Sequence, residues 1–135
     1  METIKWDDSL SVHIETIDYQ HKKLVELINE FYEHIQKGSQ KEKMQEVITA
    51  LKKYTLFHFT TEEKLMTQHH YEGLVVHKKE HEAFVAKVLD FETRYNAGKM
   101  ILSVEITNFL KNWVVNHIMG TDKKYSSFLT SKGVK

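Results

Sequence analysis

Seven residues that can bind transition metals are spread along this chain. They are His21, His58, Glu62, His77, His81, His117 and Asp122. Imidazole and carboxylate ligands suit first-row metals such as iron, whereas magnesium and calcium prefer shells made only of oxygen. Seven ligands exceed the number that one tetrahedral zinc takes, and they fit two metals that share bridging carboxylates. The residue types therefore predict a two-metal centre.

Two pairs of these residues have a spacing that favours a common helix face. His58 and Glu62 are four residues apart, and so are His77 and His81. Residues four apart on an α-helix lie about 40° apart around its axis, one turn above each other. Each pair is therefore expected to direct both of its side chains to the same side of its helix.

The third pair, His117 and Asp122, has a spacing that a regular helix does not accommodate. Residues five apart on an α-helix lie about 140° apart, on different faces. For both side chains to reach one site, the helix must loosen between them, by a π-type turn or a break, and Gly120 is the residue best able to permit this. The alternative is that Asp122 is a surface residue beyond the helix end.

Four amphipathic segments must position these residues. Apolar side chains recur at steps of three and four residues, which is typical of helices with one buried face. The expected helices span residues 17–37, 41–66, 75–96 and 102–119. Short connections make neighbouring helices antiparallel, so the expected fold is an all-α, up-down-up-down four-helix bundle. Residues 1–16 are expected to form an extended arm anchored by Trp6, and residues 120–135 a C-terminal segment of the same single domain.

The candidate ligands lie on the stripes that the helices bury. Burying so many imidazoles and carboxylates without a charge partner would be unfavourable, because each unpaired polar group costs about 2–7 kcal/mol. Metal cations offset that cost. The remaining histidines and two glutamates beside the ligands are interpreted as solvated; they are His13, His34, His69, His70, Glu63 and Glu80.

Composition excludes several other classes of function. In the 135 residues, Lys and Arg together number 19, and Asp and Glu together also number 19. This balance of charge predicts no basic surface for nucleic acid or an anionic membrane. Without cysteine there are no disulfides, thiolate nucleophiles or iron–sulfur clusters. No apolar stretch approaches the roughly 20 residues of a membrane span, and the first residues lack the pattern of a signal peptide, so the expected location is the cytoplasm.

The ligand segments resemble those of the hemerythrin family, and within it the bacterial hemerythrins. The matching segments are Trp6-Asp7, Ile17–His21, His58–Met66 (HFTTEEKLM), His77–Phe84 (HKKEHEAF) and Trp113–Tyr125 (WVVNHIMGTDKKY). The resemblance covers essentially the whole chain in order, and all seven ligand positions are filled.

This resemblance implies a non-heme di-iron site. One iron would be held by His77, His81 and His117. The other would be held by His21 and His58, which leaves it an open position for O2. Glu62 and Asp122 would bridge the two irons together with an oxo or hydroxo group.

Reversible O2 binding also requires apolar surroundings that contain no proton donor. The expected O2 pocket consists of Leu24, Phe59, Trp113, Val114 and Ile118, and each of these is also an ordinary core residue. Tyr54 and Tyr125 are expected to donate hydrogen bonds to groups behind the ligands, although both also fit the edge of an amphipathic helix.

The leading hypothesis is a reversible, non-enzymatic O2 carrier that acts as a monomer, for storage or for delivery to an oxygen-consuming enzyme. One alternative is an oxygen- or redox-sensing domain. A second alternative is a di-iron enzyme that handles peroxide or nitric oxide, but more distant relatives of that kind tend to carry additional glutamate ligands.

Overall fold

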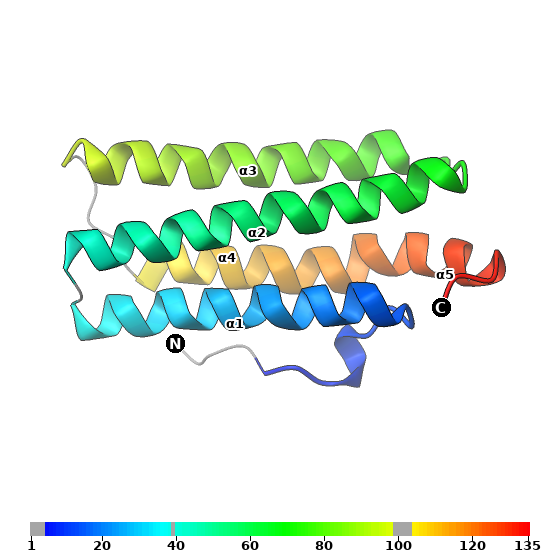
Figure 1. Cartoon of the computed structure of the whole chain (residues 1–135), viewed down its shortest axis with the longest axis horizontal. Helices are drawn as coiled ribbons and strands as arrows, with labels where there is room; N and C mark the ends of the chain where they lie inside the picture. Colours follow the sequence, from blue (N-terminus) through cyan, green and yellow to red (C-terminus); the bar gives the residue numbers. More distant parts are fainter. Residues whose placement is uncertain (1–4, 39, 99–103) are drawn as a thin grey trace.

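The computed structural model is an antiparallel bundle of four long helical segments (Figure 1). It describes residues 5–38, 40–98 and 104–135, the last range without the side chains of residues 104–107. The helices are α1 Glu15–Lys37, α2 Lys41–Gln68, α3 Leu74–Asn96 and α4 Val104–Asn116. Consecutive helices run in opposite directions, and α1 packs against both α2 and α4. The prediction of an all-α four-helix bundle is confirmed.

The fourth segment differs from the expected helix over residues 102–119. After α4 the chain continues without a break through a π-helical turn, His117–Asp122, into α5, Lys123–Ser131. The helix continues because the segment that follows Asp122 has its own buried side, formed by Tyr125, Ser126 and Leu129. The expected start at residue 102 lies outside the described residues.

Local sequence explains where the helices end. α1 stops at Gly38, whose backbone has a φ of 62° and whose N–H bonds back to the carbonyl oxygens of His34 and Ile35. Glycine adopts this left-handed conformation without a steric cost, so it is a common helix terminator. A turn that includes Gly73 separates α2 from α3.

The N-terminal arm lies along the bundle as an extended segment that contains one short 3-10 helix, Asp8–Leu10. The expected anchor Trp6 is only half-buried; Leu10, Val12 and Ile14 are buried and hold the arm more firmly. The Asp18 carboxylate accepts hydrogen bonds from the Ser11 hydroxyl at 2.6 Å and the Val12 N–H at 2.8 Å.

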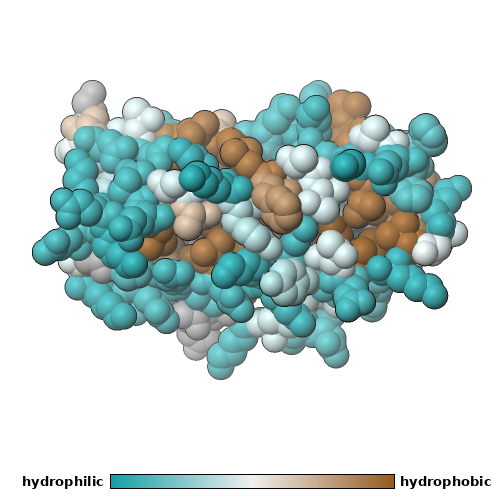
Figure 2. All heavy atoms as spheres, viewed as in Figure 1, coloured by the Kyte–Doolittle hydropathy of each residue, from teal (hydrophilic) through white to brown (hydrophobic). Residues whose placement is uncertain are grey.

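The visible surface in Figure 2 is mostly hydrophilic, with several apolar areas between the polar side chains. Exposed apolar side chains on the molecule include Phe57, Val75 and Val76. Scattered exposure of this kind is ordinary for soluble proteins. Among the described residues, no helix combines the length and the apolar character that a membrane crossing would require.

Candidate metal centre

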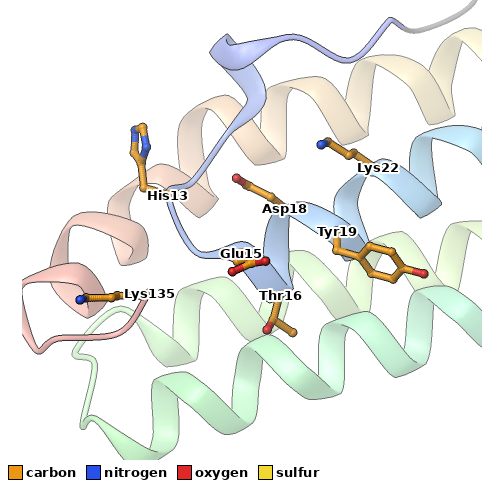
Figure 3. A pocket seen from close by; sticks show the side chains of 7 residues that line it. All are labelled: His13, Glu15, Thr16, Asp18, Tyr19, Lys22 and Lys135. Atoms are coloured by element: carbon orange, nitrogen blue, oxygen red, sulfur yellow. The ribbon is translucent and has the colours of Figure 1, made fainter.

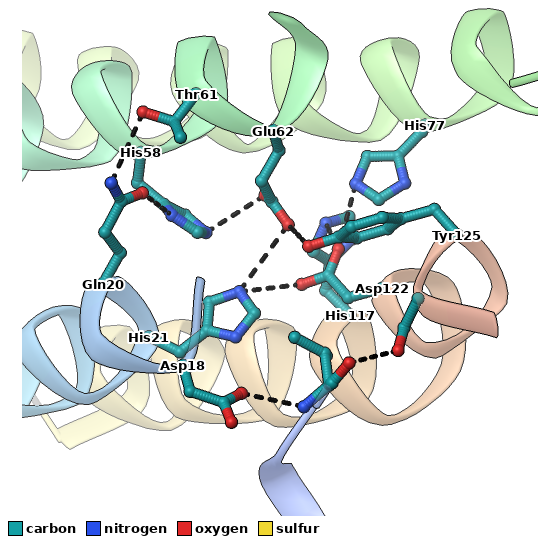
Figure 4. A network of polar contacts seen from close by, with 12 residues as sticks. Asp18, Gln20, His21, His58, Thr61, Glu62, His77, His117, Asp122 and Tyr125 are labelled. Carbon is teal, nitrogen blue, oxygen red and sulfur yellow. Dashed lines mark hydrogen bonds and ion pairs between the residues drawn. The ribbon is translucent and has the colours of Figure 1, made fainter. Parts of the chain in front are cut away.

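All seven predicted ligand residues lie together in the interior of the bundle, and Figure 4 shows six of them. They are contributed by α1, α2, α3 and the π turn, and none is more than 5% exposed. Their ligand atoms form two groups, each within 4.8 Å. The first group is Glu62, His77, His81, His117 and Asp122, and the second is His21, His58, Glu62 and Asp122. The two groups share both carboxylates.

Glu62 reaches from α2 toward histidines of both groups. Its Oε1 atom lies 3.0 Å from His58 Nε2 and 3.4 Å from His81 Nε2. Its Oε2 atom lies 3.7 Å from His21 Nε2. The carboxylate therefore stands between the groups, in the position of a bridging ligand.

Asp122 has the same relation to the two groups from the other side. Its Oδ1 atom lies 2.9 Å from His77 Nε2 and 3.0 Å from His117 Nε2, and its Oδ2 atom lies 3.1 Å from His21 Nε2. Ligand atoms that meet one first-row metal at right angles, each about 2.1 Å from it, lie about 3 Å apart. The nitrogen and oxygen atoms are thus spaced like neighbouring ligands of one ion.

The hydrogen bonds on the outer side of the rings decide which nitrogen is free to bind a metal. His81 Nδ1 lies 2.8 Å from a Glu63 oxygen and His117 Nδ1 lies 3.2 Å from a Glu80 oxygen, so both Nδ1 atoms must donate a proton. In the neutral rings both Nε2 atoms then carry lone pairs, and these atoms are 3.1 Å apart. Two lone pairs so close repel each other, and a cation that both can bind removes the conflict.

The same reasoning applies at His58. Its Nδ1 atom lies 2.8 Å from the Gln20 amide oxygen and therefore donates, which leaves a lone pair on Nε2 facing the Glu62 carboxylate at 3.0 Å. A neutral imidazole lone pair facing an anion is unfavourable in a buried site. The donor set thus fits a pair of first-row metal ions.

Charge within the centre points to the same conclusion. Burial and the nearby Glu62 oppose ionisation of Asp122, but the adjacent His117 and His21 hold the pKa of its carboxyl well below the usual range. Burial also opposes ionisation of Glu62, and its histidine neighbours, led by His58, hold its pKa well below the usual range. For His21, burial favours the neutral ring, but hydrogen bonds to Asp122 and Glu62 outweigh it and raise the pKa to about 9. Two ionised, fully buried carboxylates need positive charge beside them.

The expected deviation of the helix between His117 and Asp122 is confirmed. These six residues form a π turn, and the i to i+5 hydrogen bonding of such a turn brings residues five apart to the same side. Gly120 is less important than expected: its φ is not positive, and a Cβ added there would meet no atom within 4 Å. A side chain at position 120 would therefore meet no steric obstacle, and the π turn does not require glycine there.

The two tyrosines that were expected behind the ligands behave differently. The Tyr125 hydroxyl donates a hydrogen bond to Glu62 Oε2 at 2.5 Å. Burial and the neighbouring carboxylates raise the Tyr125 pKa well above its usual value, so the phenol keeps its proton. The buried Tyr54 hydroxyl has no hydrogen-bond partner among the described residues, so the bond expected from Tyr54 is not formed there.

The five residues expected around O2 fall into two sets. Phe59 stacks on His81 at 3.7 Å between ring centroids, and Trp113 stacks on His117 at 4.3 Å. Both rings therefore cover the three-histidine group. The Phe59 ring also lies 5.9 Å from that of His58, in the two-histidine group where O2 is expected. The other three are buried in the same core, each at most 2% exposed; they are Leu24, Val114 and Ile118.

The interpretation of Glu63 and Glu80 as solvated is wrong. Each is partly buried against the outer nitrogen of a histidine, and Glu80 also accepts hydrogen bonds from the Thr121 hydroxyl at 2.8 and 3.1 Å. Gln20, bonded to His58, was also missed. Metal-bound histidines almost always donate their second N–H to a carboxylate, carbonyl or water. This preference could have indicated from the sequence that the two glutamates lie behind histidines. No local pattern pairs Gln20 with a residue 38 positions away.

A surface hollow lies apart from this centre. It has a volume of about 760 Å³ and lies where the arm, the start of α1 and the chain's end meet (Figure 3). Its lining residues are polar or exposed, among them His13, Tyr19 and Lys135. None of the seven predicted ligands lines it.

Comparisons with known proteins agree with this geometry. The family model described as the hemerythrin HHE cation binding domain matches residues 12–129. The chain is 36% identical to a bacteriohemerythrin of Stenotrophomonas maltophilia over 127 residues, which cover 93% of this chain and 81% of the relative. It is 32% identical to the myohemerythrin of Riftia pachyptila over 124 residues, which cover 92% of each chain. A crystal structure of wild-type hemerythrin superimposes with a TM-score of 0.89 at 27% identity, and the match covers 95% of this chain and 98% of that one.

The fold and the site define a four-helix-bundle protein with two buried groups of side chains that could hold metal ions and that share two carboxylates. The chain belongs to the hemerythrin family. Hemerythrins are oxygen-binding proteins with a non-heme di-iron centre.

Proposed function

We propose that this chain binds O2 reversibly at two iron ions held by the seven buried residues, and that it works as an oxygen carrier and not as an enzyme. The observation that carries the proposal is the unequal division of histidines between two ligand groups that share Glu62 and Asp122. Three histidines and two carboxylates would nearly complete one ion's shell. Two histidines and the same carboxylates would leave the other ion an open position. Two ferrous ions would supply the electrons that O2 takes up on binding and returns on release.

The chain's own residues contribute orientation to this centre. Gln20, Glu63 and Glu80 fix the rings of three histidines so that Nε2 of each faces inward. Tyr125 holds Glu62 by a hydrogen bond. Because Tyr125 keeps its proton and already directs it at a carboxylate, the phenol is not available as a proton donor to O2.

The surroundings support reversible binding over catalysis. Leu24, Val114 and Ile118 are buried and apolar, and none of them can donate a proton. In a site without proton donors, O2 can dissociate unchanged. A proton donor beside bound O2 would promote its release in a reduced form, which leaves the metals oxidised. The proposed setting is the cytoplasm, where the monomer stores O2 or delivers it to an oxygen-consuming enzyme.

The test is anaerobic loading with ferrous iron, followed by repeated cycles of O2 and vacuum monitored by visible absorption. Metal analysis should find two irons per chain, and a visible band should appear with O2 and disappear under vacuum in each cycle. Protein loaded with zinc is the control and should develop no band, because zinc has no accessible redox chemistry. Irreversible oxidation in the first exposure, or catalytic consumption of peroxide, would reject the carrier function.

A further inference from the structure

The outer nitrogens of the five inward-facing histidines have unequal partners. His81 and His117 donate to carboxylates, those of Glu63 and Glu80. His58 donates to a neutral amide oxygen, that of Gln20. The Nδ1 atoms of the remaining two, His21 and His77, have no hydrogen-bond partner among the residues that the structure describes.

This inequality follows the division of the ligands into two groups. Both carboxylate-backed histidines belong to the three-histidine group, whereas the two-histidine group has only the amide of Gln20. Glu63 is 25% exposed and Glu80 39% exposed, so both carboxylates lie at the border between the centre and solvent. Thr121, next to the ligand Asp122, donates to both oxygens of Glu80 and keeps that carboxylate at His117.

A carboxylate behind an imidazole changes the ring as a ligand. The negative charge draws the Nδ1 proton outward and increases the electron density on Nε2, which makes the ring a stronger donor to a metal. It also favours a more highly charged metal ion, because the charge lies close to the site in a medium of low dielectric constant. A neutral amide orients the ring equally well but supplies no net charge.

We propose that Glu63 and Glu80 are positioning residues that make the two metal sites unequal: the three-histidine site binds its metal more tightly, and the two carboxylates lower the reduction potential of an iron pair. This inference rests on the proposed function. The three-histidine site retains its metal ion more firmly, and the two-histidine site has weaker donors beside the position for O2. A purely structural role would require only that each ring be held in place.

Amide variants separate charge from orientation. In Glu63→Gln and Glu80→Gln the side chain can still accept the Nδ1–H bond, but the charge is removed. Gln20→Glu makes the opposite change behind His58, in the two-histidine group. Glu82→Gln is the matched control, because Glu82 is exposed and next to His81 in sequence but makes no described contact with the centre.

The first measurement is cobalt(II) binding to metal-free protein in competition with a chelator, with the bound ions counted by native mass spectrometry. The wild type should take up two ions in separate steps. The Glu63→Gln/Glu80→Gln double variant should weaken binding of the tighter ion by about 10- to 100-fold, the usual effect of losing outer partners of metal-bound histidine. Gln20→Glu should tighten the weaker ion, and Glu82→Gln should match the wild type.

The second measurement is the reduction potential of the iron-loaded proteins, which a merely structural role would not move. The potential should rise in the double variant relative to both the wild type and Glu82→Gln. If the wild type binds two ions and the double variant matches Glu82→Gln in affinity and potential, the inference is overturned while the proposed function stands. If the wild type does not take up two ions, the proposed function fails, and this inference fails with it.

Discussion

Replacement of Tyr125 by phenylalanine should destabilise the protein because it removes the hydrogen bond that holds Glu62. The Tyr125 side chain is fully buried, and its hydroxyl lies 2.5 Å from Glu62 Oε2. The Glu62 carboxylate is equally buried, so no solvent replaces the lost donor. A hydrogen bond to a charged group contributes about 1.5–3 kcal/mol to stability.

This loss converts into a measurable change in melting temperature. An unfolding entropy of about 2.1 cal/mol/K per residue gives about 0.28 kcal/mol/K for 135 residues. A loss of about 1.5–3 kcal/mol therefore corresponds to a decrease of about 5 to 11 °C, to be measured by calorimetry on metal-free and metal-loaded protein. The metal-loaded variant should also lose metal faster to a chelator, because Glu62 is less firmly oriented.

Tyr54→Phe is a matched control from the same chain. The Tyr54 hydroxyl is buried without a hydrogen-bond partner among the described residues, so its removal breaks no hydrogen bond there. Its melting temperature should stay within about 2 °C of the wild type, the change expected for about 0.5 kcal/mol. Equal melting temperatures for Tyr125→Phe and Tyr54→Phe would refute the assignment of the Tyr125 hydrogen bond as a major stabilising contact of the centre.

Three further predictions concern the metals, O2 and pH. Glu62→Ala removes a carboxylate shared by both ligand groups, so metal analysis after dialysis should find fewer than two ions per chain; retention of two would contradict the bridging role. Ile118→Thr places a hydroxyl in the buried apolar surroundings, so iron should stay bound but visible absorption should show autoxidation at least several-fold faster than in Ile118→Val; equal rates would contradict the pocket assignment. In metal-free protein the pKa of His21 is raised from 6.5 to about 9, so its stabilising contribution is complete below about pH 6.5 and disappears as the pH rises through about 9. Denaturant unfolding from pH 6 to 10 should show this decrease, and stability that rises over the same range would contradict it.

Much of this protein follows from helical periodicity, which is a local property. Within one helix, a four-residue step places His58 beside Glu62 whatever the rest of the chain does, and the five-residue step from His117 to Asp122 requires a π turn or a break. The sequence alone therefore predicted the four-helix bundle and the disturbed helix, both of which are confirmed. The seven residues were named from type and spacing, and the structure brings all seven together.

Contacts between helices were not predictable in this way. Glu63 meets His81 across 18 residues, and Glu80 meets His117 across 37. Each contact depends on how far one helix is rotated and shifted along its neighbour, which the packing of the whole core decides. For the same reason Glu63 and Glu80 resembled solvated residues in the sequence, and Tyr54 resembled a hydrogen-bond donor to the centre. Residue types and their spacing determined which side chains face inward, and only the tertiary structure decided what lies behind each of them.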